Sequence, residues 1–176
     1  TYSRLLALII VAAVALRLAF LVVAGNTLSL QASGYDVYAV NLMDGHGYTR
    51  FDDYRPDSDL PPLYPFFLVG VYTVFGRSPM PVALIQIAFD VIMLLALAAI
   101  ARRVGGNAVA LVAVAITGFY PYLLFQNVSV NDTAIFIMLL ALGIWGSYRV
   151  TETRSWRWAA FAGLMFGIAA LTKTLV

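Results

Sequence analysis

Long apolar stretches alternate with short polar segments along this chain. Four of the stretches are close in length to the roughly 20 residues that cross the hydrocarbon core of a bilayer. They are 4–24, 80–101, 107–126 and 132–149. A fifth begins at Trp156 and continues to Val176. The pattern predicts an all-α fold, a polytopic transmembrane helix bundle of about five spans.

The segment 25–79, between the first two spans, has a different pattern and holds six of the nine acidic residues. Within it, Leu63–Gly76 is apolar, but its 14 residues are too short to cross a membrane comfortably. We predict a juxtamembrane or re-entrant helix that lies against the bundle. Earlier in the segment, helical spacing predicts a short amphipathic helix on the membrane, with one face formed by Tyr35, Tyr38, Ala39, Leu42 and Met43.

The composition of the chain also indicates a membrane protein. Of its 176 residues, 62% are hydrophobic and 11% are charged, whereas soluble domains have about 25% charged residues. So few charges cannot cover a water-soluble globule, which excludes a cytosolic enzyme, a disordered chain and a nucleic-acid-binding module. The chain has no cysteine and one histidine, which excludes disulfides, thiolate metal sites and sites with two imidazoles from this chain. We interpret the first apolar stretch as a retained helix and not as a cleaved signal peptide.

The distribution of charge predicts the orientation in the membrane. With five spans, one side receives the arginines Arg4, Arg102, Arg103, Arg149, Arg154 and Arg157. The other side receives seven aspartates and three arginines. Basic loops mark the cytoplasmic side. We therefore predict a multi-pass protein of the plasma or inner membrane, with a cytoplasmic N-terminus and an external segment 25–79.

The two ends of the sequence suggest a longer protein. It begins at Thr1, without an initiator methionine, and it stops inside an apolar run at Val176. We expect 1–176 to be a single transmembrane domain that forms the N-terminal part of a longer module.

Arg17, Gln86 and Asp90 are polar residues inside the predicted spans, where ionisable groups are costly and usually functional. Arg17 lies late in the first span, and its side chain either extends outward to water or is a counter-ion for Asp36 or a lipid phosphate. Gln86 and Asp90 are four residues apart and share one helix face. They either form an interhelical hydrogen-bond pair or contact a ligand.

Three charged residues are predicted near the external face. Asp36 begins the short amphipathic helix, where it is either a capping or a catalytic carboxylate. Asp132 opens the fourth span, where it either caps that helix or faces the same external cavity as Asp36. In the second case, the two carboxylates could divide the acid and base roles. Lys173 is either a lysine that reaches water or a cation that neutralises a lipid-linked phosphate.

The external segment leaves two further alternatives open. His46 lies between Gly45 and Gly47, where the short helix ends, and it is either a solvated turn residue or a base. The stretch Arg50–Asp59 carries four aspartates, whose hard oxygens could bind a divalent cation. They lack regular ligand spacing, and such charge runs are usually solvated loops. We assign no metal site, and a divalent cation stays a candidate cofactor.

Three motifs in a fixed order carry a resemblance to a known family. The first is Tyr38-Ala-Val-Asn-Leu-Met-Asp-Gly-His-Gly-Tyr48, followed by Pro61-Pro-Leu-Tyr-Pro65 and Phe75-Gly76. The second is Tyr120-Pro121 with Asp132 at the start of the next helix. The third is Gly163 followed by Gly167-Ile-Ala-Ala-Leu-Thr-Lys173. Together they resemble the GT-C glycosyltransferases that use polyprenyl-phosphate sugars, above all the aminoarabinose transferases and protein mannosyltransferases.

The resemblance implies a reaction and a set of roles. The donor would be a polyprenyl-phosphate sugar and the acceptor a lipid, glycan or protein, with membrane lipids as further partners and no nucleic acid. Asp36 would accept the proton of the acceptor hydroxyl while polyprenyl phosphate leaves from the opposite face, which inverts the anomeric carbon. Asp132 matches the family's second external acidic position. The substrate-binding residues would be Lys173, Arg17, Tyr38, His46 and Tyr64.

Two other functions fit a helix bundle of this kind. A non-enzymatic accessory subunit of a larger complex needs no acidic external cavity, so it would tolerate alanine at Asp36, Asp132 and Lys173. A transporter predicts interrupted spans in corresponding halves and charges at the midplane. Here the intramembrane charges lie toward one face, which disfavours transport.

Overall fold

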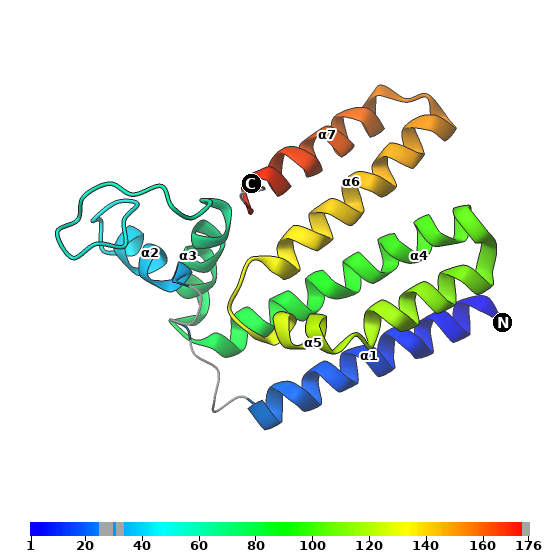
Figure 1. The fold of residues 1–176 in the computed structure, drawn as a ribbon, viewed down its shortest axis with the longest axis horizontal. Helices are drawn as coiled ribbons and strands as arrows, with labels where there is room; N and C mark the ends of the chain where they lie inside the picture. Colours follow the sequence, from blue (N-terminus) through cyan, green and yellow to red (C-terminus); the bar gives the residue numbers. More distant parts are fainter. Residues whose placement is uncertain (25–29, 31–33, 174–176) are drawn as a thin grey trace.

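The computed structural model describes residues 1–24, 30 and 34–173. Within these residues it contains helices and no strand. The helices are α1 (Tyr2–Ala24), α2 (Tyr35–Met43), α3 (Leu63–Phe75), α4 (Pro79–Gly118), α5 (Pro121–Val128), α6 (Thr133–Thr153) and α7 (Trp156–Ala170). Figure 1 shows the long helices running along one direction, with α2 and α3 together at one end. The predicted all-α class is confirmed.

Among the residues that the structure describes, three helices are long and apolar enough to cross a membrane by length and composition: Tyr2–Val23, Pro79–Gly118 and Thr133–Thr153. Large apolar side chains on their outer faces are exposed, as Val22 (78%) and Val112 (58%) illustrate. Exposing apolar surface to water costs about 25 cal/mol per Å². Such a surface is suited to lipid, and the fold is a helical membrane bundle.

Helix α4 is bent in its middle into two arms that run side by side (Figure 1). The bend lies at Gly105 and Gly106. The backbone of Gly106 has φ +77°, a conformation that residues with a Cβ rarely adopt. The second arm returns far enough for Gly118 to pack between Ala13 of α1 and Leu94 of the first arm. The two arms of α4 therefore correspond to the second predicted span and to the beginning of the third.

The third predicted span, 107–126, is wrong as one continuous helix. The helix ends at Gly118, and a separate short helix, α5, begins at Pro121. Proline has no backbone N–H and favours the first turn of a helix, so it starts α5 instead of continuing α4.

Helix α7 packs along α6 and is shorter than the predicted fifth span. Its 15 helical residues end at Ala170, and residues 174–176 of that predicted span lie outside the described residues. Two glycines of α6 allow the close approach. A Cβ on Gly143 would come within 2.7 Å of the ring of Phe166, and one on Gly146 within 2.9 Å of the ring of Phe161. The total of about five spans stays a prediction.

The predicted basic residues gather at one end of the bundle. Arg102, before the bend in α4, lies over the ring of Tyr2 at the start of α1, 4.8 Å from its centroid. Arg103 forms an ion pair with Glu152 near the end of α6, and Arg149 reaches the same carboxylate at 2.9 Å. The start of α1, the bend of α4 and the end of α6 therefore meet at this end.

Helices α2 and α3 pack against each other at the opposite end, where α3 also touches α4. The apolar face predicted for α2 is mostly covered: Tyr35, Tyr38 and Ala39 are buried, whereas Met43 is 46% exposed. This face packs within the protein, in contrast to the expectation that it lies openly on the membrane. The expected position of Leu63–Gly76 against the bundle is confirmed.

Candidate active site

The side chain of Asp36 is fully buried and both of its oxygens are bonded. Tyr72 of α3 donates its hydroxyl to Oδ1 at 2.9 Å. Arg77, in the link between α3 and α4, donates Nε to Oδ1 at 3.1 Å and Nη2 to Oδ2 at 2.5 Å. A buried carboxylate needs such partners to remain charged. The side chain joins α2 to α3 and does not cap its own helix, whose N-cap is Gly34.

Neither partner of Asp36 was predicted from the sequence. Arg77 follows an apolar stretch on the side that carries the aspartates, and this placement is the one signal that could have suggested it. The hydrogen bond from Arg77 to Asp36 raises the pKa of the Arg77 guanidinium above its ordinary value. Burial, and then the hydrogen bond to Asp36, raise the pKa of the Tyr72 hydroxyl. Tyr72 therefore stays protonated and donates.

Asp132 is held at the start of α6 by residues from two other segments. Tyr35 of α2 donates its hydroxyl to Oδ2 at 3.0 Å, and the Lys173 Nζ lies 3.8 Å from Oδ1. Asp132 occupies the N-cap position, but its side chain makes no capping bond. Instead, Asn131 Oδ1 accepts the Thr133 backbone N–H at 2.9 Å. The Asp132 carboxylate is thus directed toward tertiary contacts.

The beginning of α2 connects the two carboxylates. Tyr35 and Asp36 are neighbours in the chain, and one bonds to Asp132 while the other bonds to α3. The ring of Tyr35 packs edge-on against Tyr64 of α3, with 4.9 Å between centroids. Burial raises the pKa of the Tyr35 hydroxyl, and the charge of Asp132 raises it further. The two acidic groups therefore belong to one assembly of α2, α3 and α6.

Lys173 lies where the C-terminal end of α7 meets this assembly. The Leu63 backbone N–H donates to the Leu171 carbonyl at 3.0 Å, which joins the start of α3 to the residues after α7. The Lys173 side chain is 42% exposed. Two residues before it, Leu171 lines a hollow of about 360 Å³, together with Tyr48, Ser58, Leu60, Pro61, Pro62 and Ala170. The Lys173 cation thus borders a buried carboxylate, and a hollow begins two residues away along the chain.

The other predicted binding residues bond elsewhere. Tyr38 is buried and donates its hydroxyl to Asp57. Tyr64 is buried and donates to Gln86 Oε1 at 2.6 Å. His46 is exposed and stacks on Tyr54, with 3.8 Å between ring centroids. Of the three, Tyr64 lies beside the carboxylate assembly through its contact with Tyr35.

Two of the predicted alternatives for Arg17 disagree with the structure, and pairing with a lipid phosphate stays a prediction. Its side chain is fully buried and pairs with Asp90 of α4, with 2.9 Å from Nη2 to Oδ2. Its Nη1 donates to the carbonyls of Ala13 at 3.0 Å and Gly118 at 2.6 Å. Extension to water and pairing with Asp36 are therefore both wrong. Gln86 and Asp90 make interhelical contacts as expected, but with separate partners.

Three of the four aspartates in the loop between α2 and α3 pair with arginines of the same loop, and the four do not converge. Arg50 contacts Asp57 at 3.1 Å and Asp59 at 2.5 Å, and Arg55 lies 3.8 Å from Asp53. The hydrogen bond from Tyr38 lowers the pKa of the Asp57 carboxyl below its ordinary value. Among the described residues, no group of three or more acidic or histidine side chains is arranged to hold a metal ion.

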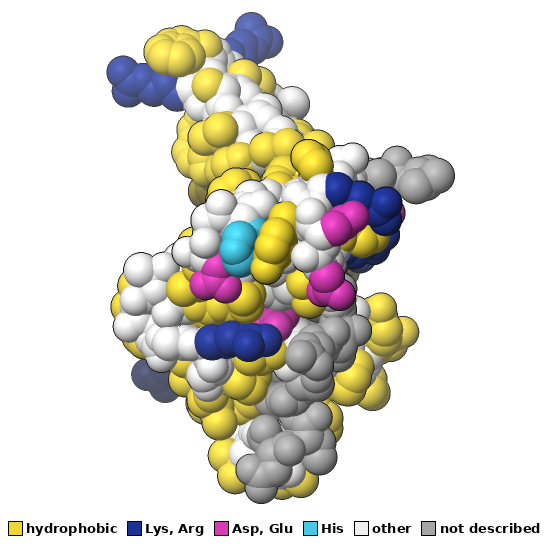
Figure 2. Space-filling model, turned by 90° about the vertical axis from the view of Figure 1, so that its left-hand side faces the viewer, with side chains coloured by type: hydrophobic (Ala, Val, Ile, Leu, Met, Phe, Trp, Pro, Cys, Tyr) yellow, Lys and Arg dark blue, Asp and Glu magenta, His cyan; other side chains and the backbone are white. Residues whose placement is uncertain are grey.

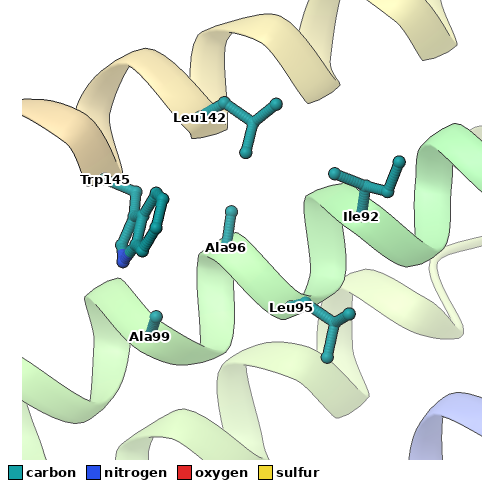
Figure 3. A pocket seen from close by; sticks show the side chains of 6 residues that line it. All are labelled: Ile92, Leu95, Ala96, Ala99, Leu142 and Trp145. Atoms are coloured by element: carbon teal, nitrogen blue, oxygen red, sulfur yellow. The ribbon is translucent and has the colours of Figure 1, made fainter. Parts of the chain in front are cut away.

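A second hollow, of about 210 Å³, lies between α4 and α6 and is lined mainly by apolar atoms (Figure 3). It is lined by Ile92, Leu95, Ala96, Ala99, Leu142 and Trp145. It offers no acid, base or cation for a reaction. By contrast, Figure 2 shows that carboxylates, the histidine and basic side chains are grouped on the face formed by the α2–α3 end. The candidate site is therefore at that end.

A comparison with protein-family models agrees with this chemistry. Residues 59–176 match the model described as dolichyl-phosphate-mannose-protein mannosyltransferase, which covers more than half of the chain. The chain belongs to this family. It is a membrane glycosyltransferase of the GT-C type, as the resemblance in the sequence indicated. Searches of curated proteins and of solved structures find no match.

The matched range contains part of the candidate site. Tyr64, Arg77, Asp132 and Lys173 fall inside it, whereas Asp36 precedes it. Asp36 is bonded to the matched range through Tyr72 and Arg77, which lie inside it.

Proposed function

We propose that this glycosyltransferase transfers a sugar from a polyprenyl-phosphate donor to a hydroxyl or other nucleophile of a lipid, glycan or protein acceptor. The reaction takes place on the external face and inverts the anomeric carbon. The main support is the pair of buried carboxylates, Asp36 and Asp132, at one end of the bundle, each bonded to a tyrosine and accompanied by a cation.

Asp36 is the proposed general base. It accepts the proton of the acceptor hydroxyl while the acceptor oxygen bonds to the anomeric carbon. The bond from that carbon to the phosphate oxygen breaks, and its electron pair leaves with polyprenyl phosphate. A positioned base typically contributes 10²–10⁴-fold to the rate. The hydrogen bond from Tyr72 supports this role, because it fixes the direction of the carboxylate.

Lys173 is the proposed cation for the departing phosphate. Its side chain is partly exposed and can approach a lipid headgroup, and the contact with Asp132 limits its movement. A fixed positive charge near the developing phosphate charge lowers the barrier. Asp132 therefore acts through Lys173 and Tyr35, and it orients the groups around the donor.

The proposed location is the plasma or inner membrane, with the N-terminus in the cytoplasm. The arginines at the meeting point of α1, α4 and α6 support this orientation, since basic residues flank spans on the cytoplasmic side. The candidate site at the opposite end then faces outward.

The change Asp36→Asn tests the base assignment, and Asp44→Asn is the matched control. Asp44 is an exposed carboxylate at the other end of the same helix. We expect D36N to lower kcat by about 100-fold or more, because asparagine cannot accept the proton. D44N should behave as the unmodified protein. The measurement is transfer from a panel of polyprenyl-phosphate sugars in proteoliposomes. Near-normal turnover by D36N would show that the base is another group.

A further inference from the structure

Arg77 covers the carboxylate that the proposed function uses as a base. Two of its nitrogens contact the two oxygens of Asp36, at 3.1 Å and 2.5 Å. The Asp36 side chain is fully buried, whereas that of Arg77 is 48% exposed. The guanidinium therefore lies between the base and the outside. In this arrangement Asp36 has no free oxygen directed at an acceptor.

Arg77 has the chemistry and the position to bind something else. A guanidinium binds phosphate through the same paired hydrogen bonds that it forms with a carboxylate. Arg77 lies in the short link between α3 and α4, where Gly76 has φ +78° and Ser78 is extended. No helix holds its backbone. When Arg77 leaves, Tyr72 still donates to Oδ1, so Asp36 keeps one partner.

We propose that Arg77 is a latch, which releases Asp36 by moving onto the phosphate of the lipid-linked donor. This inference rests on the proposed function. Without a donor, the Arg77–Asp36 contact keeps the base covered. When the donor arrives, its phosphate competes for the guanidinium, and Asp36 becomes free to take the acceptor proton. The base is then exposed only when a lipid-linked phosphate occupies the site, which limits reaction of an empty site.

A binding measurement separates the latch from catalysis. The probe is undecaprenyl phosphate, titrated against the purified protein in nanodiscs and followed by native mass spectrometry. The variants are D36N, R77Q and the double variant D36N/R77Q. R55Q is the control, since Arg55 is an exposed arginine of the external loop whose ion pair is with Asp53.

The latch predicts a specific pattern of affinities. D36N should bind the probe about tenfold more tightly, because Arg77 no longer has to leave a carboxylate. R77Q should bind about tenfold more weakly, because a charged donor to the phosphate is lost. In the R77Q background, D36N should give no tightening. R55Q should bind as the unmodified protein does.

Separate control measurements distinguish a loss of folding from a loss of function. R77Q leaves a buried carboxylate without its cation, so thermal unfolding is measured for each variant. The neutral double variant avoids that unpaired charge, and R77K keeps the charge with fewer hydrogen bonds. Equal tightening by D36N with and without Arg77 would overturn the latch, as would no tightening at all. If one of these outcomes is found while the unmodified protein still transfers sugar from polyprenyl-phosphate donors, the latch is refuted and the proposed function is not. If neither transfer nor probe binding occurs, the proposed function fails.

Discussion

Two arginine–aspartate pairs connect distant parts of this protein, and their surroundings differ. Arg17 and Asp90 join α1 to α4, and both side chains are buried, with exposed fractions of 0% and 1%. Arg77 and Asp36 join the α3–α4 link to α2, and Arg77 is 48% exposed. Water and ligands can reach the second guanidinium but not the first. The same pair of residue types is therefore suited to structure in one place and to chemistry in the other.

The buried pair should matter most for folding. Removing one partner of a buried ion pair leaves an uncompensated charge and costs about 3–5 kcal/mol. We expect D90N to lower the free energy of unfolding in detergent by about that amount, whereas D36N should lower it by about 1 kcal/mol, because water can solvate the exposed Arg77. Reversible unfolding followed by tryptophan fluorescence measures both.

The double variant R17M/D90L sharpens this test. It removes both charges, so much of the stability lost in D90N should return. If D36N destabilises the protein as much as D90N does, the two pairs do not differ in the way that their exposure indicates.

A smaller effect is expected at the tyrosine that links the two carboxylates. Tyr35→Phe removes the hydroxyl that donates to Asp132 and leaves Lys173 as the neighbouring cation. We expect the rate of sugar transfer to fall by about tenfold, with a loss of about 1 kcal/mol in stability. Tyr54→Phe, on the exposed loop, is the control and should change neither quantity. A normal rate for Y35F would mean that Asp132 does not need this contact for its role.

The smallest expected effect is a pH dependence of the loop between α2 and α3. The hydrogen bond from Tyr38, then that from the Asp59 backbone and the charge of Arg50, favour the charged form of Asp57, so its pKa lies below the ordinary 3.8. A lowered carboxyl pKa adds stability above the ordinary value, and this contribution is lost as the pH falls through the lowered pKa. We expect the amide protection of residues 48–60 to decrease below about pH 4. Hydrogen exchange measures it. The decrease should be absent from D57N and unchanged in D44N.

Several features of the fold could be predicted because they depend on short stretches of sequence. An apolar run of sufficient length must form its backbone hydrogen bonds internally in a bilayer, and α1 and α6 agree with 4–24 and 132–149 to within a few residues. The break before α5 was missed, although Pro121 marked it. A proline inside an apolar run can be recognised from the sequence alone, so this break could have been predicted.

The candidate site was only partly predictable. Asp36, Asp132 and Lys173 were named from their places at the ends of helices, and the structure brings Asp132 and Lys173 together. Their roles in catalysis stay predictions. The partners were not foreseen: Tyr72 and Arg77 are 36 and 41 residues from Asp36, and Tyr35 is 97 residues from Asp132.

The sequence by itself determined that this is a helical membrane protein with acidic groups concentrated in one segment, 25–79. Transfer free energy and backbone hydrogen bonding act over a single stretch of residues, so they can be judged from that stretch. Only the tertiary structure decided that Arg17 pairs with Asp90 and that Arg77 covers Asp36. Which side chain meets which depends on the rotation and packing of separate helices, and no local pattern records that geometry.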